Sequence, residues 1–197
     1  MNVNFRRLWQ YSFAVAMLMF VIGIAIDFTD VTTYTRRMQG YMAEGDYAKA
    51  LQVGERSDKT DRRLLLLRME ALDHEHLLGE RLFIYPVIGR GGQLVHKGGD
   101  YELCAYLIDK NLTRFVAVLP KYYALDEQLP RHYREALVLY MHQHSNPAVV
   151  YHDNVMETDY KDMQQQERLY PDPKARQMVL SQNYGGTYWY YYDYLNK

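Results

Sequence analysis

The densest group of possible metal ligands in the sequence is the tetrad Asp73-His74-Glu75-His76. Histidine and carboxylate side chains bind zinc, but residues one or two positions apart on a helix point to different faces. The zinc motif HExxH is not formed either, because Leu78 stands where its second histidine would be. We therefore interpret the tetrad as the polar end of a helix and predict no metal site there.

The other residues with acid-base or nucleophilic chemistry also favour structural roles. His142 and His144 precede Ser145-Asn146-Pro147, which ends a helix, and the helix dipole favours histidine at a C-terminus. Cys104 lies among apolar neighbours with no histidine beside it, which predicts a buried, inert thiol. The sequence thus predicts no catalytic residue and no cofactor. The alternatives are a metal-binding or pH-dependent role for the histidines and a nucleophilic Cys104.

Two further patterns are of the kind that binds anions. Gly89–Gly92 and Gly98-Gly99 form a glycine-rich stretch, but neither GxGxxG nor the Walker motif is present, and Lys97 precedes its glycines. We interpret this stretch as a loop. Arg62 and Arg63 belong to a basic group with interleaved acids, which is typical of a solvated, ion-paired helix face. The net charge of -1, from 23 basic and 24 acidic residues, predicts no nucleic-acid partner.

Tyrosine is the one compositional excess, at 20 of 197 residues. Its ring is large, stiff and amphipathic, so it suits both helix packing and protein interfaces. One interpretation is that the rings pack in the core and cap the end of the fold. The other is a partner-binding surface, for which the candidates are Tyr188, Trp189, Tyr191, Tyr192, Tyr133 and Tyr140.

The elements that position these residues begin with an uncharged run from Leu8 to Ile26, LWQYSFAVAMLMFVIGIAI. At about 1.5 Å per residue, a helix of this length just covers the ~30 Å hydrocarbon core of a bilayer. The run is apolar on every side, so it predicts a helix that spans the membrane rather than one that lies on its surface. Residues 1–30 are predicted to be a single-pass anchor.

Charges around the run predict its orientation. Arg6 and Arg7 precede it, whereas Asp27 and Asp30 follow it, and basic flanks stay in the cytoplasm. We expect the rest of the chain in the periplasm, attached to a bacterial inner membrane. The alternative is a cleaved secretory signal, since Gly23-Ile24-Ala25 offers a cleavage site of small residues. The run is longer than the apolar region of a usual signal peptide, which favours the anchor.

Residues 31–145 show the patterns of short, paired helices. Thr32 or Thr33 is predicted to cap a helix that ends near Ala43. Gly45-Asp46 is predicted to break the chain before a helix with an apolar stripe at Tyr47, Ala50, Leu51 and Gly54. The segment GDYAKAL, Gly45 to Leu51, resembles the turn and second helix of a tetratricopeptide repeat, with Tyr34 and Tyr41 at the aromatic positions of its first helix. The resemblance implies an α-solenoid.

Further helices continue this pattern. Asp61 is predicted to cap a leucine-rich helix that packs on both sides, Gly99 to open a helix to about Lys110, and Pro120 to split the next one. Pro130 fits the first turn of a helix with a stripe at Tyr133, Ala136, Leu137, Tyr140 and Met141. Because short amphipathic helices bury their faces by stacking, residues 31–145 are predicted to form an all-α, TPR-like solenoid of about three antiparallel helix pairs.

Residues 146–197 are predicted to form a helical extension. Val149–Tyr151 fits an extended segment, and helices are expected over about 161–169 and 174–182, separated by Tyr170-Pro171-Asp172-Pro173. The aromatic end, GGTYWYYYDYLNK, would supply the terminal cap that a solenoid needs.

Three segments are similar to the C-terminal domain of an uncharacterised family of Bacteroidetes membrane proteins: Leu77–Pro86, Leu129–Tyr140 and Gly185–Tyr192. The similarity spans most of residues 45–195. Members of that family carry several membrane spans ahead of the domain, whereas this chain has one predicted span. The resemblance implies no catalytic residues.

The patterns together predict a membrane-anchored, non-enzymatic scaffold or accessory subunit that binds protein partners on the extracytoplasmic side. The alternative function is an envelope hydrolase or transferase with a cleft between helices, using scattered acids such as Glu75, Glu80 or Glu102 with a histidine. A deep pocket with converging carboxylates would favour the enzyme, and a shallow groove lined by rings would favour the scaffold.

Overall fold

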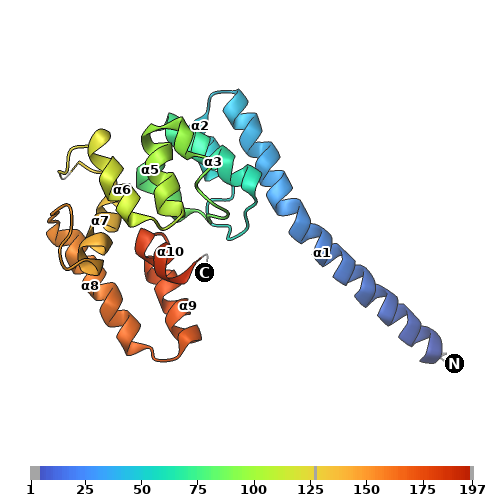
Figure 1. Cartoon of the computed structure of the whole chain (residues 1–197). Coiled ribbons are helices and arrows are strands. Elements are labelled where there is room, and N and C mark those ends of the chain that lie inside the picture. The colour runs from blue at the N-terminus through green and yellow to red at the C-terminus, as the bar shows by residue number, and fades with distance from the viewer. Residues whose placement is uncertain (1–4, 127, 196–197) are drawn as a thin grey trace.

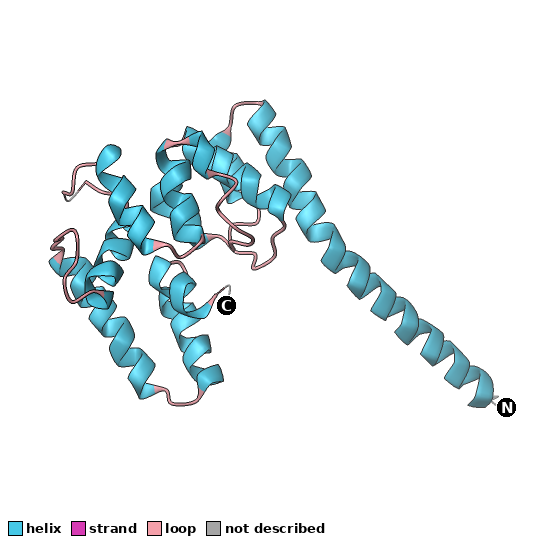
Figure 2. Cartoon of the chain, viewed as in Figure 1, coloured by secondary structure: helices cyan, strands magenta, loops and turns pink. Residues whose placement is uncertain are grey.

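The computed structural model describes residues 5–126 and 128–195, with side chains along the first helix described at positions 11, 13, 15–19 and from 30 onward. The described part is all-α and contains no strand, as the sequence predicts (Figure 2). Its helices are α1 (Phe5–Ala43), α2 (Tyr47–Gln52), α3 (Arg62–His74), α4 (Leu78–Arg81), α5 (Gly99–Ile108), α6 (Leu112–Val118), α7 (Arg131–Gln143), α8 (Asn154–Leu169), α9 (Pro173–Tyr184) and α10 (Tyr188–Tyr194). Three 3-10 turns join them: η1 (Leu82–Ile84), η2 (Val95–Lys97) and η3 (Leu119–Lys121).

The first helix is one continuous rod of 39 residues, about 58 Å long, that projects from the body (Figure 1). The predicted helix start at Thr32 or Thr33 is wrong, because α1 passes through both positions. A threonine caps a helix only where the preceding chain leaves helical geometry, and no proline or glycine lies between Ile24 and Gln39 to make it do so. The predicted end at Ala43 is confirmed.

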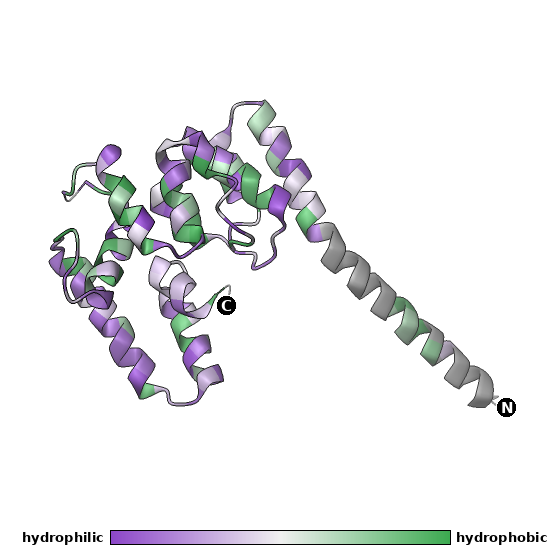
Figure 3. Cartoon of the chain, in the orientation of Figure 1, coloured by the Kyte–Doolittle hydropathy of each residue, from purple (hydrophilic) through white to green (hydrophobic). Residues whose placement is uncertain are grey.

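The last third of α1 packs on α2 and α3 through Val31, Tyr34, Met38, Tyr41 and Met42. The described stretch of the projecting part is largely green in Figure 3. Its exposed large side chains are Tyr11, Phe13, Val15, Met17, Leu18 and Met19. Within the described residues no helix combines the length and apolarity that a membrane crossing needs. The side chains at 8–10, 12, 14 and 20–26 of the predicted span lie outside the described residues.

Local signals end α1 and begin the next two helices. Gly45 adopts a positive φ of 77°, and the Asp46 carboxylate then accepts a hydrogen bond from the Lys49 backbone N–H at 3.0 Å, which caps α2. The predicted stripe to Gly54 overshoots, because α2 ends at Gln52 and Gly54 lies in a turn with φ of 63°. Asp61 caps α3 as predicted, through a 2.7 Å hydrogen bond from the Leu64 N–H.

The centre of the body is α7, which α4 and α6 contact directly. Gly79 of α4 lies so close to α7 that a Cβ there would stand 2.5 Å from Cζ of Tyr133. Pro120 ends α6 and places η3 after it, which confirms the predicted split. Pro130 lies just before the first residue of α7.

The C-terminal extension is helical, and more of it forms helix than its sequence predicts. Asp153 caps α8, which begins at Asn154, well before the expected position 161. The helix buries Met156, Tyr160 and Met163. Residues 149–151 form no strand. Helix α10, which carries the rings expected to cap the fold, turns back and contacts α7 as well as α9 (Figure 1). The rings at the C-terminus therefore close the fold onto its centre.

Candidate functional site

The aromatic residues predicted to bind a partner lie mostly in the interior. Relative exposure is 0% for Tyr188 and Tyr133, 1% for Trp189, 2% for Tyr191 and 4% for Tyr140, whereas Tyr192 is half-buried. Phe83 packs against the rings of Tyr188 and Tyr191, with centroids 5.0 Å and 4.7 Å away. Buried rings offer no contact area to a partner, so core packing, the other interpretation of these tyrosines, describes what the structure shows.

A buried carboxylate, Glu135 of α7, holds the returning C-terminal segment. Its Oε2 accepts hydrogen bonds from the Tyr188 backbone N–H at 2.6 Å and from the ring of His132 at 2.9 Å, and its Oε1 accepts from Nε of Arg131 at 2.8 Å. The backbone carbonyl of the same residue accepts the indole N–H of Trp189 at 2.7 Å. One residue therefore joins α7 to α10 by two hydrogen bonds and is itself held by two more from within α7.

His132, which is also fully buried, completes this network. Its Nε2 accepts the Phe83 backbone N–H at 3.2 Å, so the proton of a neutral ring lies on Nδ1, which donates to Glu135. Both ring nitrogens are thus committed to structural bonds. Sequence reasoning missed this pair, although the spacing of three residues puts both on the helix face next to Ala136.

A second polar group surrounds the first turn of α5. One oxygen of Asp100 accepts the hydroxyls of Tyr123 and Tyr133 at 2.8 Å and 2.9 Å, and the Tyr133 hydroxyl lies 3.6 Å from Sγ of Cys104. Burial raises the pKa of the Cys104 thiol, and burial followed by the negative charges nearby raises the pKa of Tyr133. At neutral pH the thiol and the phenol therefore keep their protons, which fits an inert Cys104.

The acids considered for an enzyme do not converge. Glu75 is exposed at the end of α3, and Glu80 accepts the Arg131 backbone N–H at 2.6 Å. Glu102 accepts the hydroxyls of Tyr122 and Tyr106, and the bond from Tyr122 is the main cause that lowers the pKa of this carboxyl. Each acid that forms a bond supports a local packing contact.

The histidines also make local contacts. His74 stacks on the Tyr47 ring with centroids 4.1 Å apart, His142 bonds Glu157 at 3.0 Å, and His144 donates to the Tyr140 carbonyl at 2.9 Å. Across the described residues, no three His, Cys, Asp or Glu side chains are grouped to hold a metal ion.

Tyrosine burial predicts an alkaline limit to stability. Burial, then the charges of Asp73 and Glu70, raise the pKa of Tyr101 to about 12, from 10.0 in an exposed phenol. The folded state favours the neutral phenol, so its contribution is complete below pH 10 and is lost between about pH 10 and 12, by up to about 1.4 kcal/mol per pH unit. We expect Tyr101→Phe to reduce the slope of stability against pH in urea unfolding followed by circular dichroism. An unchanged slope would show that Tyr101 ionises equally in both states.

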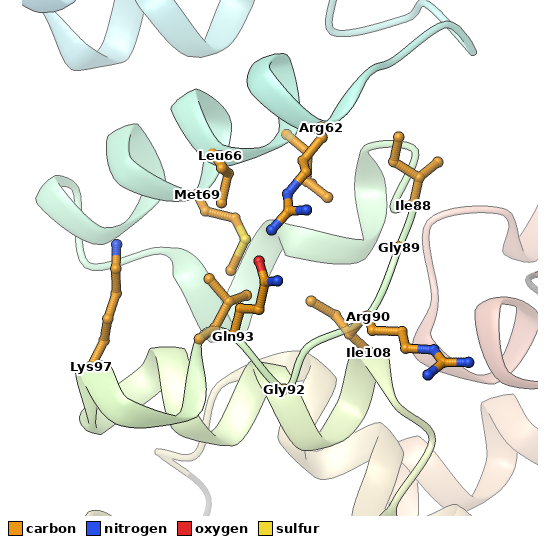
Figure 4. A pocket seen from close by; sticks show the side chains of 12 residues that line it. Arg62, Leu66, Met69, Ile88, Gly89, Arg90, Gly92, Gln93, Lys97 and Ile108 are labelled. Carbon is orange, nitrogen blue, oxygen red and sulfur yellow. The ribbon is translucent and has the colours of Figure 1, made fainter.

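A hollow of about 610 Å³ lies between α3, the glycine-rich loop and the end of α5 (Figure 4). That volume is within the range of small-molecule sites. The apolar wall consists of Leu65, Leu66, Met69, Ile88, Leu94 and Ile108. The leucine-rich helix α3 contacts α1 and α2 as well as α4 and η1, as its apolar circumference predicts, whereas Leu66 lines this hollow and is 40% exposed.

Cationic side chains lie around this cavity. Figure 4 shows the guanidinium of Arg62 and the amide of Gln93 pointing toward one another across its middle, Lys97 at one end, and Arg90 pointing away from the middle. In the described part of the chain, Arg62 and Lys97 form no ion pair with an acid; Lys97 lies over the Tyr101 ring at 4.3 Å. Two cations beside an apolar wall suit an anionic amphiphile.

A glycine fixes the loop that forms one wall. The Gly91 N–H donates to the Asp109 carboxylate at 2.8 Å, and a Cβ at Gly91 would stand 2.1 Å from the backbone oxygen of Ala105. Only glycine permits this close approach of loop to helix. The glycine-rich stretch is thus a loop, as predicted, and its conformation creates the cavity.

Comparison with known proteins concerns the second half of the chain. Residues 98–195 match the model of a family of unknown function, DUF6057. The match begins at α5 and includes the Asp100 group, the Glu135 network and α10, whereas α1 to α4 lie outside it. No curated protein and no solved structure matches the chain.

Proposed function

We propose that this protein is a membrane-anchored helical module that docks protein partners beside the bilayer without catalysing a reaction. The observation that carries the proposal is the course of α1, which leaves the body and projects outward as one rod with apolar side chains exposed (Figure 1). Exposed apolar surface of this extent is costly in water and marks a contact with lipid or protein. The uncharged run from Leu8 to Ile26 lies on this rod.

The orientation and the docking role form the second part of the proposal. Arg6 and Arg7 lie before the run, so the body would face the periplasm of a bacterial inner membrane. Within the described residues, helices that follow one another in sequence contact each other from α1 to α10, which supports a stacked, TPR-like arrangement. Such stacks present extended surfaces to partner segments.

Charges in the middle of the run test the anchor. We expect the full chain to stay in the membrane pellet after a high-pH carbonate wash, with residues 1–25 retained in its measured mass. Met17→Asp together with Leu18→Asp should release it, because each charge near the centre of a span costs about 2.5–3.5 kcal/mol. The matched control, Thr33→Asp with Gln39→Asp, changes two exposed positions beyond the run and should stay in the pellet.

Two separate fusions after Lys197 test the orientation. Alkaline phosphatase is active only outside the cytoplasm, and a fluorescent protein is active only inside it. Phosphatase activity is the expected result. Release of unprocessed wild-type chain by the wash would contradict the anchor, and fluorescence with no phosphatase activity would reverse the orientation.

A further inference from the structure

The cavity beside α3 lies near the level at which α1 would leave the bilayer. Lys59, three residues before Arg62, forms an ion pair with Asp30 of α1 at 3.5 Å. Asp30 is four residues, or about 6 Å of helix, beyond the end of the apolar run at Ile26. The head-group layer of a bilayer is about 5–8 Å thick on each side, so the start of α3 would lie at the depth of lipid head groups.

We propose that this cavity binds one anionic phospholipid of the surrounding membrane, a role that rests on the anchoring proposed above. The phosphate would lie between Arg62 and Lys97 with Gln93 as a further donor, since the other charged side chain of the lining, Arg90, points away from the middle in Figure 4. An acyl chain would lie along Leu66 and Ile88, the two apolar residues of the lining with substantial exposure, at 40% and 38%. Charged donors and an apolar wall in one cavity fit a molecule that has both parts, and they fit neither inorganic phosphate nor a neutral lipid as well.

The charges of the neighbouring elements favour an anion as the occupant. Asp109 of the α5 end is committed to the Gly91 N–H, and Asp61 to the α3 cap. Glu70 and Asp73 of α3 act on Tyr101, over whose ring Lys97 lies. None of these four acids forms an ion pair with Arg62 or Lys97 in the described residues. Filling the cavity would link α3, the loop and α5, and so would hold the body in a fixed orientation on the membrane surface.

Lipid retention measured by native mass spectrometry tests this site on the full chain in a non-ionic detergent. The probes are phosphatidylglycerol, phosphatidylcholine, dodecanoate and inorganic phosphate. Wild-type protein should retain one phosphatidylglycerol in preference to the other three. Arg62→Glu with Lys97→Glu should lower that retention at least about tenfold, because each cation near the lipid surface contributes a severalfold gain.

Matched controls separate the cavity from general attraction to anionic lipid. Arg36→Glu with Arg37→Glu makes the same charge change on exposed positions of α1 and should leave retention within about twofold. Leu66→Asp, at 40% exposure in the cavity wall, should abolish retention, whereas Leu125→Asp, at 38% exposure elsewhere, should not.

Equal loss in the α1 control, equal retention of phosphatidylcholine, or preference for dodecanoate or phosphate would each overturn the proposal. The readout is made in detergent, so it does not depend on membrane insertion. If the carbonate wash releases the chain but the chain still retains phosphatidylglycerol, the anchoring proposal is contradicted and the lipid-site proposal stands. If the chain stays in the membrane but retains no phosphatidylglycerol, the lipid-site proposal is contradicted and the anchoring proposal stands.

Discussion

Glu135→Leu is expected to destabilise the body by about 2–6 kcal/mol, a large share of the stability of a domain of this size. The side chain is 1% exposed and accepts three hydrogen bonds, two of them from donors with no access to water: the His132 ring and the Tyr188 N–H. Leucine has a similar volume but no acceptor. Each orphaned buried donor costs about 1–3 kcal/mol, whereas Arg131, at 38% exposure, can turn to solvent.

Urea unfolding followed by far-ultraviolet circular dichroism in a non-ionic detergent measures this loss. The matched control is Glu157→Leu, since Glu157 also bonds a histidine, His142, but is 27% exposed. We expect the control to change the free energy of unfolding by no more than about 1 kcal/mol. If Glu135→Leu changed it no more than the control does, the network would not be what holds α10 on α7.

Trp189→Ala should cost about 3–5 kcal/mol, the usual price of truncating a large buried side chain. The indole is 1% exposed, packs beside the Tyr160 ring at 5.2 Å and donates to the Glu135 carbonyl. Its loss leaves a cavity where α10 meets α7 and α8. Because the substitution acts on the body, we expect the variant to remain in the membrane fraction.

The same unfolding measurement with Met178→Ala provides the comparison. Met178 lies on α9 with 60% exposure, so its truncation should change stability by less than about 0.5 kcal/mol. If the Trp189→Ala protein were as stable as this control but bound a protein partner less tightly, the aromatic end would form an interface rather than part of the core.

Much of the fold follows from local chemistry in the sequence. Some helix boundaries depend only on residues within one helical turn. The boundaries at Asp61, at Pro120 and at the Gly45-Asp46 turn are of this kind, and each lies where the structure has it. The early start of α8 was also readable, because Met156, Tyr160 and Met163 recur on one helix face behind the Asp153 cap. The continuity of α1 was missed because a capping residue acts only where the chain bends.

The sites depend on contacts between distant segments, which periodicity does not specify. Glu135 meets the Tyr188 N–H across 53 residues, so the role of α10 as a closing element could not be read from its rings alone. The cavity is assembled from α3, the loop and α5, and its existence depends on the close approach at Gly91. Sequence patterns identified the arginines and glycines separately, without the packing that joins them.

The position of α1 in the membrane is tested most directly by cysteine labelling with a membrane-impermeant maleimide. The native Cys104 is fully buried, so single introduced cysteines report alone in folded protein. We predict that Arg36→Cys reacts from the periplasmic side and that Met17→Cys reacts from neither side until detergent is added. Reaction of Met17→Cys in intact membranes at the rate of Arg36→Cys would contradict the anchored arrangement.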